Sequence, residues 1–251
     1  MNKLNKKTIL GISIESQSKK QVLEKIKKFI ASPRGFYHIV SLNPENLVLA
    51  QKNKSFKQTL ETAQIKIVDG AGVVVASQIL GVEQGQRITG GELMEELIEL
   101  ANSMRLRVLL LGGRPNLANS LADCYAKRFT EAKFKGVEGV RQIQKPKKIE
   151  EDELFSIVAR YKPQVVFASF GSPYQELWLD RHSNKFDGMV CMGVGGAFDY
   201  FGGVVPRAPE FLRKIGLEWL FRLMVQPWRW RRQLRLIKFC WLVLKEKWKM
   251  K

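Results

Sequence analysis

The sequence predicts an α/β fold in which helices cover a mostly parallel β-sheet, followed by a basic helical appendage at the C-terminus. Two observations predict this. Short β-branched runs alternate with segments whose apolar residues recur at helical spacing, which is the pattern of a parallel sheet. The composition then shifts near Pro206, after which basic residues and tryptophans predominate. We therefore predict an α/β domain at 1–205 and an appendage at 206–251.

The elements of the first domain follow in order. Strands are predicted at 36–42, 65–68, 107–111, 164–170 and 188–192. Helices are predicted between them, at 19–30, 44–52, 91–104, 116–129 and 151–161. Asn43 is suited to cap the second of these helices. No linker rich in proline, glycine or serine divides these 205 residues, so we expect one Rossmann-like domain.

Length and composition exclude several classes of protein. A chain of 251 residues with 45% apolar side chains has enough material for a sizeable core, so it is neither disordered nor a disulfide-stapled miniprotein. Three scattered cysteines and two histidines argue against a structural zinc site, and we expect no bound metal. The N-terminal apolar run is too short for a signal peptide, and we find no apolar stretch of about 18 residues.

The net charge of +18 is concentrated in the appendage. Residues 206–251 contain 13 basic and three acidic side chains, a net +10, and five of the six tryptophans. Such side chains suit a membrane headgroup interface, although a nucleic-acid surface uses the same types and core helices of an ordinary domain are a third possibility. We expect an anionic membrane surface as the partner, and no nucleic acid.

Polar and glycine-rich segments follow each predicted strand, where ligands of open α/β sheets bind. They are Ser41–Asn46, Asp69–Gly72, Gly112–Asn116, Gly171–Glu176 and Gly193–Asp199. Gly112 and Gly113, before a helix, would present backbone amides to a diphosphate, but a plain turn explains them equally well.

Asp69 is the candidate catalytic residue. A carboxylate at a strand end beside glycines would serve as a general base or bind a metal, and capping the following helix is an equally good explanation of its position. No D-x-D pair occurs in the chain. We therefore expect arginines such as Arg87, together with backbone amides, to neutralise any diphosphate.

Taken in order, these segments resemble the WecG/TagA/CpsF family of glycosyltransferases. The resemblance rests on SLNPENLVLAQKN, IVDGAGVVVASQILG, RITGGEL, VLLLGGRPNLA, FASFGSPYQELW, MGVGGAFDYFGG and RAPEFLRKIGLEWLFRLMVQPWRWRR, and it covers about residues 36–235. It implies an inverting transfer of N-acetylmannosamine from UDP to N-acetylglucosamine on undecaprenyl diphosphate, for wall teichoic acid or a related polymer. The reaction would take place on the cytoplasmic face of the membrane, to which the enzyme would bind peripherally.

The resemblance also implies roles for particular residues. Asp69 matches the proposed catalytic base. The implied substrate-binding residues are Ser41, Asn43, Arg87, Gly112, Gly113, Gly171, Gln175, Asp199, Arg222, Arg229 and Arg232. The last three belong to the appendage and would lie over the acceptor's diphosphate. Gln226 and Glu92 replace residues that are usually Glu and Asp in the family, which leaves open another donor, such as N-acetylmannosaminuronic acid or a hexose.

The leading hypothesis is thus a metal-independent glycosyltransferase in which Asp69 deprotonates the acceptor 4-hydroxyl. A basic nucleic-acid-binding protein is the rival from another class, but the chain lacks an RNP motif, a zinc pattern and a helix-turn-helix. A silent nucleotide-sugar-binding module is a third possibility. The basic, tryptophan-rich appendage also allows a homo-oligomer, whose size the sequence does not define.

Overall fold

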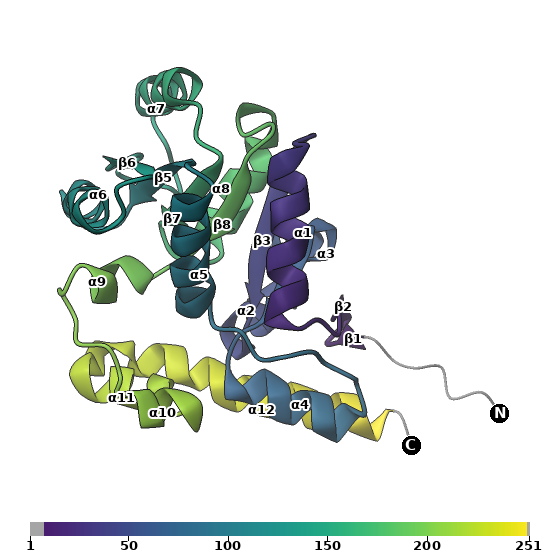
Figure 1. Ribbon diagram of the computed structural model, residues 1–251. Helices are drawn as coiled ribbons and strands as arrows, with labels where there is room; N and C mark the ends of the chain where they lie inside the picture. Colours follow the sequence, from purple (N-terminus) through teal and green to yellow (C-terminus); the bar gives the residue numbers. More distant parts are fainter. Residues whose placement is uncertain (1–7, 250–251) are drawn as a thin grey trace.

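The computed structural model describes residues 8–249, apart from the side chains of Arg229 and Arg232. It confirms the α/β class: six parallel strands form one sheet in the order β4-β3-β8-β7-β5-β6, with helices on both faces (Figure 1). The strands are β3 (Tyr37–Leu42), β4 (Ile65–Val68), β5 (Arg107–Gly112), β6 (Lys133–Val137), β7 (Val165–Ser169) and β8 (Val190–Gly193). A short antiparallel hairpin, β1 (Thr8–Ile9) with β2 (Ile12–Ser13), precedes them.

The two faces of the sheet carry different helices. One face packs against α1 (Lys19–Ala31), α5 (Gly90–Ser103) and α6 (Leu117–Arg128). The other packs against α2 (Pro44–Ala50), α3 (Lys54–Thr62), α4 (Ala71–Leu80), α7 (Lys148–Tyr161) and α8 (Tyr174–Arg181). Successive strand residues point to opposite faces, so Ile39 joins the core beneath α1 while Val40 joins the core beneath α2. Burial on both faces explains why the central strands are apolar runs.

Several helix starts follow from local chemistry. Asn43 caps α2, as predicted, because its side chain accepts a hydrogen bond from the Asn46 amide. The side chains of Ser18 and Thr89 begin α1 and α5 with capping boxes, in which Gln21 and Glu92 bind back to the cap residue's amide. The Thr89 cap begins α5 next to the carboxyl end of β4, where the Gly90 amide binds Asp69.

The chain then passes through η1 (Ser183–Lys185) and α9 (Ala197–Phe201) into the helical appendage. The appendage contains α10 (Glu210–Lys214), α11 (Glu218–Val225), η2 (Pro227–Arg229) and α12 (Trp230–Trp248). It lies at the carboxyl-end side of the sheet, where α12 runs beside α4 (Figure 1). Phe239 and Val243 of α12 are 2% exposed and share a core with α2 and α4. The predicted helical appendage is therefore observed, whereas its boundary as a separate domain stays a prediction.

Some elements were absent from the sequence prediction, namely β6, α3, α9 and the hairpin. Strand β6 is an edge strand whose residues are all at least partly exposed, and two of its five residues are lysines, so it lacks the apolar run that marks the central strands. Gly136 within it lies so close to α6 that an added Cβ would sit 2.3 Å from the backbone of Ala118. Within residues 8–249, no helix combines the length and apolar character needed to cross a membrane.

Candidate active site

Two adjoining chambers open at the carboxyl ends of the strands. The strand-end chamber, about 370 Å³, is lined mainly by the loops that follow β3, β5, β7 and β8. The tail chamber, about 340 Å³, lies between the start of α4, the segment 87–91 and the helices of the appendage. Six of the described residues line both chambers: Asn43, Glu45, Asp69, Gly90, Gly91 and Arg222. A ligand in one chamber would therefore meet a ligand in the other beside Asp69.

Asp69 is held at this junction by the first turn of α5. Its Oδ2 accepts a hydrogen bond of 3.2 Å from the Gly90 amide. A Cβ on Gly90 would lie 3.3 Å from Ser41 Oγ and 3.5 Å from Asp69 Oδ2, so glycine lets the helix begin tightly against both side chains. Helix α4 starts after Gly70 without a side-chain cap, so the interpretation of Asp69 as its cap is wrong. The carboxylate remains accessible to both chambers.

The surroundings of Asp69 favour a proton acceptor that works near neutral pH. Burial raises the pKa of Asp69 from 3.8 to about 6, while the Gly90 amide opposes this shift. Glu218 raises the same pKa further, and Arg222 lowers it. A carboxyl group with a pKa in this range is ionised at pH 7 yet more basic than an ordinary aspartate, as general-base catalysis requires.

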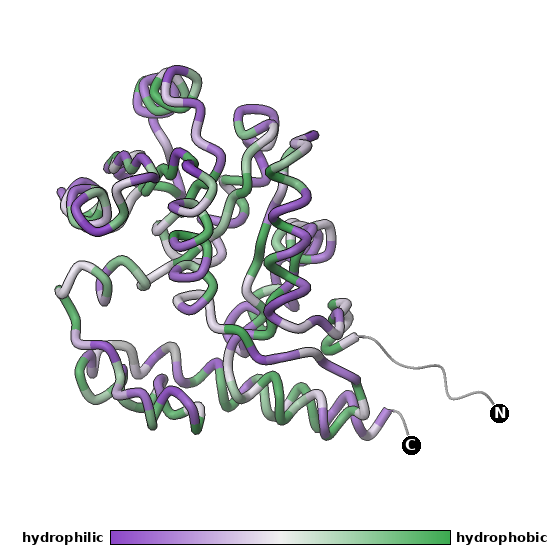
Figure 2. The backbone as a smooth tube through the Cα atoms, in the orientation of Figure 1, coloured by the Kyte–Doolittle hydropathy of each residue, from purple (hydrophilic) through white to green (hydrophobic). Residues whose placement is uncertain are grey.

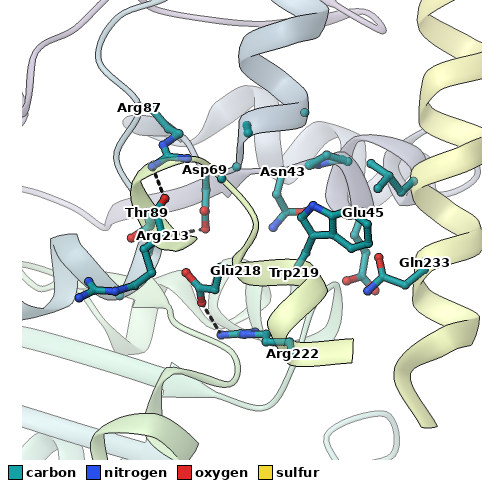
Figure 3. Close-up of a pocket in the computed structure, with 18 of the residues that line it drawn as sticks. Asn43, Glu45, Asp69, Arg87, Thr89, Arg213, Glu218, Trp219, Arg222 and Gln233 are labelled. Carbon is teal, nitrogen blue, oxygen red and sulfur yellow. Dashed lines mark hydrogen bonds and ion pairs between the residues drawn. The ribbon is translucent and has the colours of Figure 1, made fainter. Parts of the chain in front are cut away.

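The appendage contributes charged side chains to the junction. Glu218 and Arg222 lie one turn apart on α11 and form an ion pair at 3.3 Å. The Arg222 guanidinium also stacks over the ring of Tyr200, 4.1 Å from its centroid. Figure 3 shows Glu218 and Arg222 below Asp69 in the view, with their ion pair drawn as a dashed line. The prediction that Arg222 belongs to the pocket is therefore supported by its position, and Glu218 joins it there.

Arg87 lines the tail chamber, but it also binds the appendage directly. Its Nη2 donates a hydrogen bond of 2.7 Å to the carbonyl of Arg213 in the last turn of α10 (Figure 3). The same carbonyl accepts a hydrogen bond of 3.2 Å from the Gly216 amide, and a guanidinium at a helix C-terminus also interacts favourably with the helix dipole. Arg87 thus connects the α/β body to the appendage.

Most of the remaining predicted residues line the strand-end chamber: Ser41, Asn43, Gly113, Gly171, Gln175 and Asp199. Asp199 is paired with Arg114 at 3.0 Å, which places a cation on the chamber wall. Gly112 is absent from the wall, because the space beside its Cα is filled by Phe170: an added Cβ would lie 2.6 Å from that ring. The side chains of Arg229 and Arg232 lie outside the described part of the structure.

Several residues of the site were missed by the sequence analysis: Glu45, Arg114, Glu176, Tyr200, Arg207, Arg213, Glu218 and Trp219. The segment Gly112-Gly113-Arg114 gave a signal for Arg114, since it directly follows a strand. Glu218 gave none, because only the docking of the appendage brings it near Asp69. Among the described residues, no three His, Cys, Asp or Glu side chains are grouped so as to hold a metal ion.

A carboxylate base between two chambers, with arginines nearby, is an arrangement suited to group transfer between two bound molecules. The family comparison decides which kind of transfer. The model of the "Glycosyl transferase WecG/TagA/CpsF family" matches residues 7–251. The chain belongs to this family. It is therefore a glycosyltransferase, as the sequence motifs predicted.

Curated relatives agree with the family assignment. The chain is 32% identical over 225 residues to the N-acetylglucosaminyldiphosphoundecaprenol N-acetyl-beta-D-mannosaminyltransferase of Staphylococcus aureus (strain MRSA252), covering 89% of this chain and 85% of the relative. It is 31% identical over 209 residues to the protein of the same name from Bacillus subtilis (strain 168), covering 83% and 79%. The similarity thus extends over most of this chain and most of each relative.

Proposed function

We propose that this glycosyltransferase moves N-acetylmannosamine from UDP to the 4-hydroxyl of N-acetylglucosamine on undecaprenyl diphosphate, with inversion. The observation that carries the proposal is the position of Asp69, which borders both chambers. The strand-end chamber would hold the UDP-sugar, and the tail chamber would hold the acceptor. The names of the relatives support the acceptor and the transferred sugar.

In this mechanism Asp69 removes the proton of the attacking hydroxyl. The acceptor oxygen attacks the anomeric carbon from the face opposite UDP, the bond to the UDP oxygen breaks, and the proton moves to Asp69 Oδ. The hydrogen bond from Gly90 fixes the orientation of the carboxylate. Ser41, whose Oγ lies close to Gly90, is a hydroxyl available to bind the sugar at the same junction.

Negative charge develops on the departing UDP, and the chamber wall carries cations that can stabilise it. Arg114 and Arg222 both line the strand-end chamber. Guanidinium groups bind phosphate oxygens in a bidentate manner, and electrostatic stabilisation of this kind is a large contribution to catalysis. We accordingly propose that the transfer proceeds without a resident metal ion.

The appendage is proposed to bind the enzyme to an anionic membrane. On α12, Leu234, Ile237, Trp241, Leu244 and Trp248 are each more than half exposed and recur at intervals of three and four residues, so they form one apolar stripe. Phe239 and Val243 occupy the opposite side of the helix and are buried. Figure 2 shows hydrophobic and hydrophilic residues interspersed along the helices of the appendage. An exposed apolar stripe flanked by lysine and arginine is typical of an interfacial helix.

Apolar side chains of the appendage also line the tail chamber. Trp219 and Leu236 form part of its wall, and Trp219 is 40% exposed. An acceptor whose sugar lies beside Asp69 would thus have apolar side chains along the route from its diphosphate to the lipid. These contacts favour a lipid-linked acceptor over a soluble one.

The test is a screen of UDP-sugars with a short-chain polyprenyl diphosphate N-acetylglucosamine acceptor, scored by released UDP in the presence and absence of EDTA. We expect UDP-N-acetylmannosamine to be the best donor and EDTA to have no effect. Preference for a uronic acid or hexose donor would revise the sugar, and loss of activity in EDTA would overturn metal independence. Wall teichoic acid synthesis is the process in which such a product is used.

A further inference from the structure

The side chain of Gln175 joins two glycine loops of the strand-end chamber. It lies at the start of α8 and is 2% exposed. Its Oε1 accepts hydrogen bonds from the Gly171 amide at 3.0 Å and from the Gly195 amide at 3.2 Å. Gly171 follows β7 and Gly195 follows β8, which are neighbouring strands. One carboxamide oxygen therefore fixes the separation of two loops that line the chamber.

The orientation of this carboxamide is set by Glu176. Gln175 Nε2 donates to Glu176 Oε1 at 2.8 Å, and Ser172 Oγ donates to the same oxygen at 2.7 Å. Glu176 Oε1 accepts both of these bonds, so it holds the NH₂ end of Gln175 toward itself and leaves the carboxamide oxygen to the two glycine amides. Glu176 is 1% exposed, and its burial raises its pKa.

The glycine at the end of β8 is explained by the same side chain. A Cβ on Gly193 would lie 2.5 Å from Gln175 Nε2, so Gly193 provides the space that the carboxamide occupies. Ser169 Oγ in β7 adds a hydrogen bond of 2.6 Å to the Gly195 carbonyl. The loop after β8 is thus bound to α8 through the Gly195 amide and to β7 through the Gly195 carbonyl.

Burying a carboxylate and a carboxamide is costly unless their hydrogen bonds are made. Here most of these bonds go to the two loops rather than to a core element. We propose that Gln175 and Glu176 are positioning residues that set the spacing of the loops at Gly171 and Gly195, and thereby the affinity of the strand-end chamber for a nucleoside diphosphate. The identity of the ligand, a nucleoside diphosphate, rests on the proposed function. The positioning role of Gln175 and Glu176 does not.

The first test compares Gln175→Ala with a matched control, Gln164→Ala. Gln164 Oε1 also accepts a hydrogen bond from a neighbouring strand, from the Arg107 amide at 2.8 Å, but at the amino ends of β5 and β7. We would measure UDP affinity by calorimetry and site-resolved amide hydrogen exchange by NMR. We expect Gln175→Ala to weaken UDP binding by about tenfold or more and to accelerate exchange at both Gly171 and Gly195. The control should change neither.

The second test exchanges the two groups. Gln175→Glu alone places two carboxylates together and should accelerate exchange at both glycines. Adding Glu176→Gln again places one carboxamide beside one carboxylate, so a hydrogen-bond donor faces an acceptor as in the wild type. The double variant should therefore regain the slow amide exchange of the wild type. Unchanged exchange in Gln175→Ala, or a double variant no better than Gln175→Glu, would overturn the proposal. If the wild type does not bind UDP, the proposed donor fails, while the exchange measurements still test the positioning pair.

Discussion

Arg87 of the α/β body donates a hydrogen bond of 2.7 Å to the carbonyl of Arg213 in the appendage. The two residues are far apart in the chain, and their contact lies at the wall of the tail chamber. Gly216, just beyond α10, completes this contact region, because an added Cβ there would sit 2.4 Å from Ala71 Cβ. The appendage is therefore held against the same short segment that positions Asp69, so its docking and the formation of the site are coupled.

We expect Arg87→Ala to loosen α10 and α11 without unfolding the sheet. The variant leaves the Arg213 carbonyl without its guanidinium partner, and trypsin should cleave after Arg213 or Lys214 several times faster than in the wild type. Arg105→Ala is the control, since Arg105 forms an exposed ion pair with Glu131 on the body. Equal cleavage rates in Arg87→Ala and the wild type would show that this hydrogen bond does not hold the appendage.

Gly216→Ala should displace the appendage and strongly reduce activity on a membrane-bound acceptor. Gly216 has a φ of +81°, and its new methyl group would also collide with Ala71. Gly203→Ala is the matched control, because Gly203 has a φ of +70° but no atom within 4 Å of an added Cβ. Both variants carry the backbone cost of about 1–2 kcal/mol, and only Gly216→Ala carries the collision.

The collision can be relieved in a second variant. Replacing Ala71 with Gly in the Gly216→Ala background removes the opposing methyl group, so activity and protease resistance of the appendage should recover in part. If Gly203→Ala and Gly216→Ala lose the same activity, backbone strain alone explains the loss and the contact with Ala71 is unimportant.

The exposed stripe of α12 predicts a defined loss of membrane binding. Ile237→Glu and Trp241→Glu place charges on side chains that are 68% and 56% exposed, so folding should be little affected. Each should weaken binding to anionic liposomes by at least about tenfold, since an apolar side chain that inserts contributes roughly 1.5–3 kcal/mol. Ile149→Glu, on the 66%-exposed Ile149 of α7, should bind as the wild type does. Equal binding by all three variants would exclude the stripe as the membrane contact.

The strands and the position of Asp69 were predictable because they depend on local patterns. Apolar runs mark strands that are buried on both faces, and a polar residue directly after such a run must lie at the carboxyl edge. Edge strand β6 escaped prediction because it is recognised by its pairing with β5, and its own residues do not reveal that pairing. Glu218 escaped for a related reason: its role arises from its effect on Asp69, which is distant in sequence.

The raised pKa of Asp69 predicts both a rate profile and a stability profile. Activity should rise with pH through about 6 as the base loses its proton, and Asp69→Asn should lower turnover by about 10²–10⁴.

The stability profile follows from the same shift. Because the pKa of Asp69 in the folded protein lies above its ordinary value of 3.8, folding favours the protonated form, and this stabilisation is lost as pH rises through about 6. Asp69→Asn should therefore gain stability relative to the wild type at pH 8, whereas Asp123→Asn, at an exposed position on α6, should not.

Glu218→Gln should move the acid limb of the rate profile to lower pH. Its carboxylate raises the pKa of Asp69, as Glu92 does to a smaller extent, while Arg222 lowers it. Neutralising Glu218 removes the repulsion and also ends its ion pair with Arg222, and both changes favour ionised Asp69. Glu210→Gln is the matched control: Glu210 forms the equivalent i,i+4 pair with Lys214 on α10, on the exposed side of the appendage. An acid limb that is identical in Glu218→Gln and Glu210→Gln would mean that the appendage docks without tuning the base.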